Sequence, residues 1–360
     1  MTVLLSNIQD GPKSNNLILA SYPNNIKKNA EHDFLVNKTS QLFGSLNAFG
    51  TASTVFEMVE KDMNYFKDEI KLFDFQPEVW KNWQEAHKNP IEIFILPDNL
   101  KPKAQYIRQG TQKQLHFHSF KSKCDHEMVH TCLFFDVIAH ETGHAILDIL
   151  RPGYYSSTNR QTKALHESFG DLTVMFTILS IPILRYEFFN ATKGDLNKKS
   201  FFPAIAESFA EAIGCIYEGL RDSTNKIRLD QIKPLNYHSM SQTFTGAIYD
   251  LLDFMYRDRR MASSSQYSDD EILNFVGRTL RKVVFQAFIQ HRFHNPSLLD
   301  MANEVIQIIK STAGFEQEAK VIEKIFADRG IDAKTLTKLQ KNYDKEVEHG
   351  EGFSICHTCH

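Results

Sequence analysis

Hydrophobic residues recur at helical spacing through most of the chain after about residue 132, and strand-like patterns occur only before it. Helical spacing predicts helices over residues 52–71, 134–150, 164–184, 202–220, 244–256, 270–291, 298–311 and 316–329. An apolar run bounded by prolines, at 90–97, predicts a strand. Alternation over 104–108 and 114–120, around a turn containing Gly110, predicts a hairpin. The pattern predicts an α+β fold, with a mixed N-terminal part and an all-helical C-terminal part.

Shifts in composition divide the chain into four segments. Residues 1–45 are polar and rich in asparagine, which predicts a loosely packed arm. Residues 46–150 form a mixed α/β subdomain that ends in a strongly apolar helix, and residues 151–335 form a helical subdomain. Residues 336–360 form a tail with cysteines and histidines. The length of 360 residues exceeds what one hydrophobic core usually supports, which agrees with two subdomains.

Charge and composition exclude several classes of protein. Lysine and arginine number 41 against 44 for aspartate and glutamate, so no basic excess indicates a nucleic-acid partner. The longest apolar stretch, 172–184, contains Pro182 and is shorter than the roughly 18 residues that indicate a membrane span. The first residues do not resemble a signal peptide, and the five cysteines mostly lie near histidines, unlike a disulfide scaffold. We therefore expect a cytoplasmic protein, or one exported without a cleaved signal peptide.

The most informative segment is Val137–Asp148, which contains His140-Glu141-Thr-Gly-His144. Residues four apart lie on one face of a helix, so His140 and His144 can bind one metal ion together. Glu141 can then reach a water on that metal as its general base. A five-residue pattern also arises by chance on ordinary core helices. The apolar neighbours weigh against chance, because they indicate that the two imidazoles are buried and need partners.

A catalytic zinc needs a third protein ligand and an open fourth position. Some twenty residues after His144, the segment Ala164–Asp171 carries Glu167, which could complete a set of two histidines and one glutamate. Asp171, one turn later on the same face, could orient a ligand histidine from outside the ligand set. The alternative is the solvated face of an amphipathic helix, but large apolar residues flank both acids.

These motifs resemble the thermolysin-like (gluzincin) neutral zinc metallopeptidases. The resemblance rests on residues 136–145 and on the pair Glu167 and Asp171, and it extends in patches from about 45 to 331. The other patches are 104–106, which looks like the family's substrate-binding edge strand, and 219–222, 237–241, 246–249 and 326–331. The resemblance implies a thermolysin-like fold with the zinc helix between its two subdomains. It also implies a zinc endopeptidase that uses a metal-activated water and cuts protein or peptide substrates before large apolar residues.

The resemblance further implies roles for single residues. Glu141 would take the proton of the water and later deliver it to the leaving amine. Zinc would polarise the scissile carbonyl and lower the pKa of its water to about 7. His238 would stabilise the oxyanion, and Arg221 would hold a substrate carbonyl beside the S1′ pocket. A tyrosine usually assists the oxyanion, and Tyr155 is the best candidate here, with Tyr154 next.

The chain also departs from the family pattern. The third ligand lies a few residues further from the zinc helix than in the family, so the loop that bears the tyrosines is altered. His166 stands where the family often has asparagine, which would place another imidazole next to the ligands. The acidic loops that bind calcium in secreted members, and a long pro-region, are not evident. We therefore expect a modified substrate range.

Histidines and cysteines gather in two further places. One lies just before the zinc helix and the other is the C-terminus, where Cys356 and Cys359 each precede a histidine. The first comprises His116, His118, Cys124, His126, His130 and Cys132. The C-terminal Cys-x-x-Cys could form half of a second, structural zinc site, and Cys124 with Cys132 could supply the rest. The alternative is a mobile tail and a polar loop. Cys215, in an apolar pattern, is predicted to be a buried small hydrophobe.

Two other functions compete with the endopeptidase. A non-catalytic binding or scaffold protein could keep the same fold with a structural zinc, but it would not need Glu141, Arg221 and His238 together. An aminopeptidase would need an acidic anchor for the amine of its substrate, and no such motif is visible upstream of His140. The endopeptidase is the function that the sequence favours.

Overall fold

The computed structural model describes residues 13–20, 41–96, 102–214, 220–233, 236–262 and 266–339. The chain forms two compact units, which are described separately. The sheet unit comprises residues 1–152, 173–177 and 204–221, and the helical unit comprises 153–172, 178–203 and 222–360. The fold is mixed α+β, with a small sheet and a helical C-terminal region, as the hydrophobic pattern predicts.

The sheet unit is built on five strands in the order β1-β2-β4-β3, with β5 paired to β4. The strands are β1 (Leu17–Leu19), β2 (Ile91–Leu96), β3 (Ala104–Gln109), β4 (Gln112–Lys121) and β5 (Met128–His130). β2 runs parallel to β1 and β4, whereas β3 and β5 run antiparallel to β4. The predicted strand and hairpin are confirmed. Gly110 takes a φ of 62° in the hairpin turn, a conformation that favours glycine.

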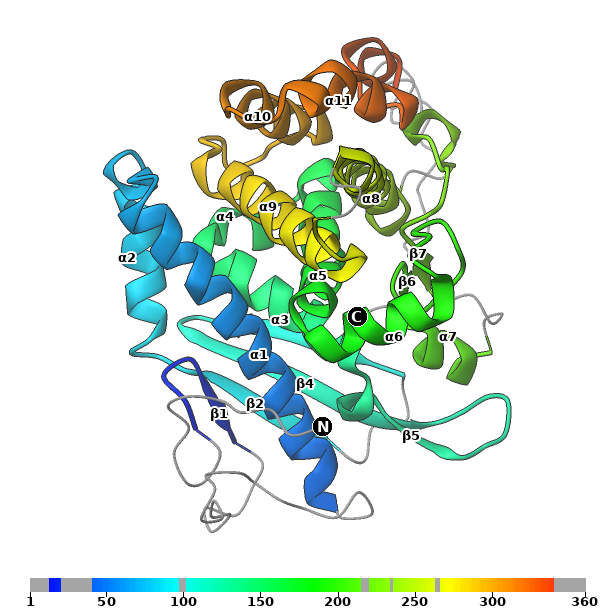
Figure 1. The fold of residues 1–360 in the computed structure, drawn as a ribbon. Helices are drawn as coiled ribbons and strands as arrows, with labels where there is room; N and C mark the ends of the chain where they lie inside the picture. Colours follow the sequence, from blue (N-terminus) through cyan, green and yellow to red (C-terminus); the bar gives the residue numbers. More distant parts are fainter. Residues whose placement is uncertain are drawn as a thin grey trace, which may run out of the picture. The chain divides into compact units, whose positions relative to one another are not determined.

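Three helices complete most of the sheet unit: α1 (Gln41–Asp68), α2 (Pro77–Ala86) and α3 (Phe135–Leu150). α1 and α3 pack against each other and against the sheet (Figure 1). The side chains that the register brings together on β2, β4 and β3 are Ile93, Leu115 and Tyr106, and all three are buried. Alternation along the strands therefore supplies the apolar face on which the helices pack.

The N-terminal part holds more structure than the sequence predicts. Leu17 and Leu19 are buried and pair with Ile91 and Ile93, although their segment is predicted to be a loosely packed arm. α1 begins at Gln41 rather than at residue 52, and α2 is not predicted at all. A strand of three residues forms because it pairs with a neighbouring strand. Local periodicity cannot reveal such a pairing.

The prediction of one helix over 202–220 is wrong. The described residues there form β6 (Ala204–Ile205) and a short helix, α7 (Glu207–Ala212), followed at 221–222 by β7 (Arg221–Asp222). Ala206 takes a φ of 57° and Gly214 a φ of 78°, so the backbone leaves the right-handed helical region at both ends of α7. The apolar residues of this segment therefore lie on an irregular backbone and not on one face of a single helix.

The helical unit is formed mainly by helices, most of them long. They are the single turn α4 (Pro152–Tyr155) and α5 (Arg160–Ser180), α6 (Pro182–Thr192), α8 (Tyr237–Ala262), α9 (Asp269–Gln290), α10 (Leu298–Ser311) and α11 (Glu316–Asp328). α8 packs against α9 and α11, and α10 packs against the same two helices. The predictions over 270–291, 298–311 and 316–329 are confirmed, and α8 extends beyond 244–256 at both ends.

The prediction of one helix over 164–184 is corrected to two helices. Pro182 lies in the first turn of α6, where a residue without an N–H is tolerated. Ile181 before it has an extended backbone and ends α5. No single helix in the described ranges is long and apolar enough to cross a membrane. α5 and α6 reach that length and hydropathy only together, and they are bent by 92° at their break.

A buried arginine joins the end of α11 to α8. Arg329 is 2% exposed and donates hydrogen bonds to Asp250 Oδ2 (2.8 Å), Asn225 Oδ1 (2.9 Å) and the Gly246 carbonyl (3.3 Å). A Cβ at Gly246 would lie 2.6 Å from Arg329 Nη1, so only glycine leaves room for the guanidinium. The cost of burying this charge is offset because an acid and two further acceptors surround it.

Candidate metal centre

α3 carries the predicted metal motif, and tertiary contacts rather than a side-chain cap secure its first turn. Its N-cap residue, Phe134, makes no capping hydrogen bond. Asp136 instead accepts hydrogen bonds from the backbone N–H groups of Val137 (2.8 Å) and Ala206 (2.6 Å). A carboxylate is favoured at a helix N-terminus. Burial nevertheless raises the pKa of Asp136, against the lowering effect of these two hydrogen bonds.

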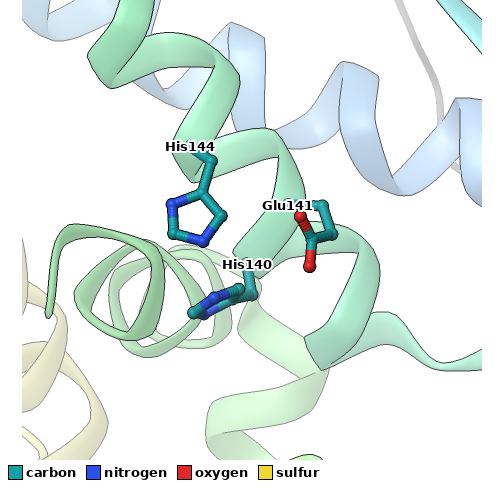
Figure 2. Close-up of side chains that lie close together, drawn as sticks. All are labelled: His140, Glu141 and His144. Carbon is teal, nitrogen blue, oxygen red and sulfur yellow. The ribbon is translucent and has the colours of Figure 1, made fainter. Parts of the chain in front are cut away.

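His140, Glu141 and His144 form one compact group of possible metal ligands on α3. Their ligand atoms lie within 4.8 Å of one another, and the two imidazole rings lie 4.4 Å apart, on the same side of the helix (Figure 2). His140 and His144 are only 7% and 8% exposed, whereas Glu141 is half-buried. Over the described residues this is the one group of three or more histidine, cysteine or acidic side chains that could hold a metal ion.

The chemistry of the donor atoms fits a borderline metal ion. Imidazole nitrogens suit zinc, copper, iron and nickel, whereas calcium and magnesium prefer oxygen ligands. The two rings are almost perpendicular, at 82°, and little exposed. The group can therefore hold a metal ion, and its composition favours a transition metal or zinc over calcium.

Arg221 lies against one of these histidines. Its Nη2 atom is 3.4 Å from His140 Nδ1. A guanidinium only donates hydrogen bonds, so Nδ1 is the acceptor in this contact. Arg221 therefore places a positive charge beside one of the two imidazoles that could hold a metal ion.

The Glu141 carboxylate is oriented by strand β3. Its Oε2 atom accepts a 2.7 Å hydrogen bond from the backbone N–H of Tyr106. The Tyr106 hydroxyl donates to Asp148 Oδ2 (2.6 Å), and Arg108 Nη1 donates to Asp148 Oδ1 (2.7 Å). Burial raises the pKa of Asp148, while the hydrogen bond from Tyr106 and the charge of Arg108 oppose that rise.

Sequence reasoning missed this network, although a signal for it exists. Asp148 follows Glu141 by seven residues, or two helical turns, so both carboxylates lie on one face of α3. Tyr106 and Arg108 are two residues apart on β3, so their side chains lie on the same side of the strand. What the sequence does not give is that these two faces meet.

The helical unit brings together two of the predicted site residues. Glu167 on α5 and His238 on α8 approach each other, with 3.1 Å between Glu167 Oε2 and His238 Nδ1. Asp171, one turn after Glu167, is buried at 1% exposure. The ring of His166 lies 6.0 Å from that of Tyr155. Each pair lies within the helical unit, and the assignment of Glu167 as third ligand stays a prediction.

The structure separates the two candidate tyrosines by exposure. Tyr154 is 1% exposed, and its ring lies 6.4 Å from that of Phe288. Tyr155 is half-buried. Tyr155 is therefore the more accessible of the two, and its role at the oxyanion stays a prediction.

The histidine and cysteine cluster before α3 forms no second metal group among the residues that the structure describes. Cys132 is buried, and burial raises the pKa of its thiol to about 11, which disfavours the thiolate that binds metals. Cys124 is exposed, with its sulfur 3.1 Å from the Glu211 carbonyl. Burial lowers the pKa of both His116 and His118. The remaining cysteines, Cys215, Cys356 and Cys359, lie outside the described residues.

No model of a known protein family matches this chain, and no curated protein matches its sequence. The resemblance to the thermolysin-like peptidases therefore rests on the motifs themselves, above all on the segment that forms α3.

Proposed function

We propose that the chain is a zinc-dependent endopeptidase of the thermolysin-like type, which cuts before large apolar residues. The observation that carries the proposal is the group on α3, where two buried imidazoles lie beside a glutamate whose carboxylate is held by a backbone N–H. A structural zinc site is closed by four protein ligands and needs no oriented carboxylate next to them.

The proposed ligands are His140, His144 and, from its spacing in the sequence, Glu167. Zinc supplies Lewis-acid polarisation of a carbonyl and of water when it is bound. Glu141 accepts a proton from the attacking water and passes it to the leaving amine. The hydrogen bond from Tyr106 engages one oxygen of Glu141 and so restricts the orientation of the carboxylate.

The remaining proposed roles concern the substrate. His238 donates a hydrogen bond to the oxyanion, a contribution of about 3 kcal/mol for such a donor. Tyr155 assists it. Arg221, whose guanidinium lies beside His140, would hold a substrate carbonyl next to the S1′ pocket. Asp171 and His166 orient groups around the ligands.

The first experiment compares Glu141→Gln with wild type and with the exposed control Glu127→Gln. The glutamine keeps the size of the side chain but cannot accept a proton at neutral pH. We expect peptide hydrolysis to fall on the order of a hundredfold or more in Glu141→Gln, with zinc content by elemental analysis near one ion per chain. Glu127→Gln should match wild type.

Two outcomes would contradict the proposal. Hydrolysis that persists in Glu141→Gln would mean that this glutamate is not the base. A zinc-loaded wild-type chain that cleaves no member of a broad peptide library would favour the binding or scaffold function.

Cleavage specificity follows from the proposed S1′ pocket. We expect cuts on the amino side of Leu, Phe, Ile or Val. One missing methylene costs only about 1–3 kcal/mol in an apolar pocket, so the preference should be graded. Sequencing the products of a peptide library measures it. A pattern dominated by charged residues on the carboxyl side of the cut would exclude an apolar pocket.

A further inference from the structure

Strand β3 lies at the end of the sheet order and packs against α3. Its residue Tyr106 pairs with Leu115 on β4 and points to the face on which α3 packs. Two acids on α3, Glu141 and Asp148, lie two turns apart on the helix face that meets this strand. One residue of the strand thus contacts two acids of the helix.

Tyr106 holds both acids, one with its backbone and the other with its side chain. Its N–H donates to Glu141 Oε2 over 2.7 Å, and its hydroxyl donates to Asp148 Oδ2 over 2.6 Å. Arg108, two residues along the strand, donates to the other oxygen of Asp148 over 2.7 Å. Both oxygens of Asp148 are therefore bound by β3.

Asp148 constrains the strand because it has no contact with solvent. Its side chain is 0% exposed, and a buried carboxylate is costly unless charged or polar groups satisfy it. Both groups that donate to Asp148 come from β3. Its hydrogen bonds therefore form only when Tyr106 and Arg108 lie opposite Asp148 on α3. Hydrogen bonds to a charged acceptor are stronger than hydrogen bonds to a neutral one, so Asp148 holds Tyr106 and Arg108 more firmly than a neutral side chain would.

We infer that Asp148 is a positioning residue for Glu141: by binding Tyr106 and Arg108 it fixes β3 where the Tyr106 N–H holds the Glu141 carboxylate. The effect on turnover rests on the proposed role of Glu141 as base. The effect on the strand does not, because it follows from contacts between residues that are all in the sheet unit.

Kinetics of Tyr106→Phe and Asp148→Asn test the inference. Tyr106→Phe removes only the hydroxyl and keeps the backbone N–H, while Asp148→Asn keeps the shape and an acceptor oxygen but loses the charge. Small displacements of a catalytic group cost up to about a hundredfold in rate, so we expect kcat to fall about tenfold in each variant. Tyr106 belongs to the segment that resembles a substrate-binding edge strand, so KM should rise as well, and the fall in kcat at saturating substrate is the diagnostic change. Zinc content should stay at the wild-type level.

Tyr249→Phe is the matched control, because it removes a buried hydroxyl with an equally short hydrogen bond, 2.6 Å to the Leu196 carbonyl on the helical unit. It should lose a comparable stability and keep the wild-type kcat. Asp148→Asn should also retain more activity than Asp148→Leu, which removes the acceptor altogether. Wild-type kcat in both Tyr106→Phe and Asp148→Asn would overturn the inference.

Amide hydrogen exchange at Tyr106 gives a measurement that needs no peptidase activity. We expect faster exchange in Tyr106→Phe (followed at residue 106), in Asp148→Asn and in Glu141→Ala, and unchanged exchange in Tyr249→Phe. Unchanged protection in Asp148→Asn would overturn the inference even in an active enzyme. If the exchange pattern is as expected but the chain has no peptidase activity, the proposed function is wrong. The placement of β3 by Asp148 would still be supported.

Discussion

α10 and α3 have similar lengths, 14 and 16 residues, but they are stabilised in different ways. α10 begins with a capping box, in which Ser297 Oγ accepts from the Asp300 N–H (3.1 Å) and the Asp300 carboxylate accepts from the Ser297 N–H (2.8 Å). It buries an apolar stripe and leaves a polar one to solvent. α3 has no side-chain cap and buries all but three of its residues, including histidines, a threonine and an aspartate.

The difference shows where each helix obtains its hydrogen-bond partners. The groups that secure α10 lie within four residues of one another. Two acids of α3 accept hydrogen bonds from residues distant in the chain, Asp148 from Tyr106 and Asp136 from Ala206. Changes in α3 should therefore alter the chemistry of the site and the strand beside it, whereas changes in α10 should alter stability alone.

The largest expected effect is the rise in the free energy of unfolding of the chain when zinc binds to α3. At free zinc a thousand times above Kd, binding to the native state should add about 4 kcal/mol to the free energy of unfolding. His140→Ala combined with His144→Ala should abolish this gain, while Ser297→Ala in α10 should preserve it. Denaturant unfolding with and without zinc measures the gain. A zinc-dependent gain that survives the double substitution would place the metal elsewhere, the cysteines being the first candidates.

A smaller effect is expected at the cap of α10. Ser297→Ala removes the acceptor for the Asp300 N–H and should lower the free energy of unfolding by about 1 kcal/mol. Zinc content and turnover should not change. Ser311→Ala, at the other end of the same helix, is the control, and its effect should be smaller. Equal losses in the two variants would mean that the cap is not what stabilises the start of α10.

The smallest effect concerns an ion pair between α2 and α1, 3.5 Å from His87 Nε2 to Glu60 Oε1. The hydrogen bond with Glu60 raises the pKa of His87 above 6.5, and the same bond lowers the pKa of Glu60 below 4.5. The contribution of His87 to the free energy of unfolding is complete below pH 6.5 and is lost as the pH rises through the raised pKa of His87. The glutamate's contribution is present above 4.5 and is lost as pH falls through the lowered pKa.

The pair should therefore stabilise the fold most between about pH 4.5 and 6.5, by no more than about 1 kcal/mol, because both side chains are partly exposed. Unfolding of wild type and His87→Gln across this range measures the difference. A constant difference from pH 4 to 9 would show that the histidine acts through packing and not through charge.

Local signals account for what the sequence predicts well. The observed bounds of α10 match the prediction because its apolar periodicity is visible in the sequence, and the structure adds the Ser297–Asp300 cap at its start. His140, Glu141 and His144 are found for a similar reason, since their spacing alone places them on one helix face. The hairpin of β3 and β4 is likewise marked by its own turn.

Other features depend on contacts that local patterns do not contain. β1 exists because it pairs with β2, and α1 reaches back to Gln41 through a segment with two glycines, Gly44 and Gly50, which weaken its local preference for a helix. The segment at 202–220 has apolar residues at helical spacing, but the positive φ of Ala206 breaks the helix. The hydrogen bond between Tyr106 and Asp148 joins residues 42 positions apart, and only the packing of β3 on α3 creates it.

The contact between Gly246 and Arg329 has a consequence for how this sequence can change over evolutionary time. Alanine at 246 collides with the guanidinium, and loss of the arginine alone leaves the Asp250 carboxylate with Lys226 and without the donor to its Oδ2 atom. Either change by itself is unfavourable, but a smaller residue at 329 makes room for a larger one at 246. Substitutions at contacting sites of this kind are not additive. A descendant of this chain with a side chain at position 246 should therefore also carry a smaller residue at 329.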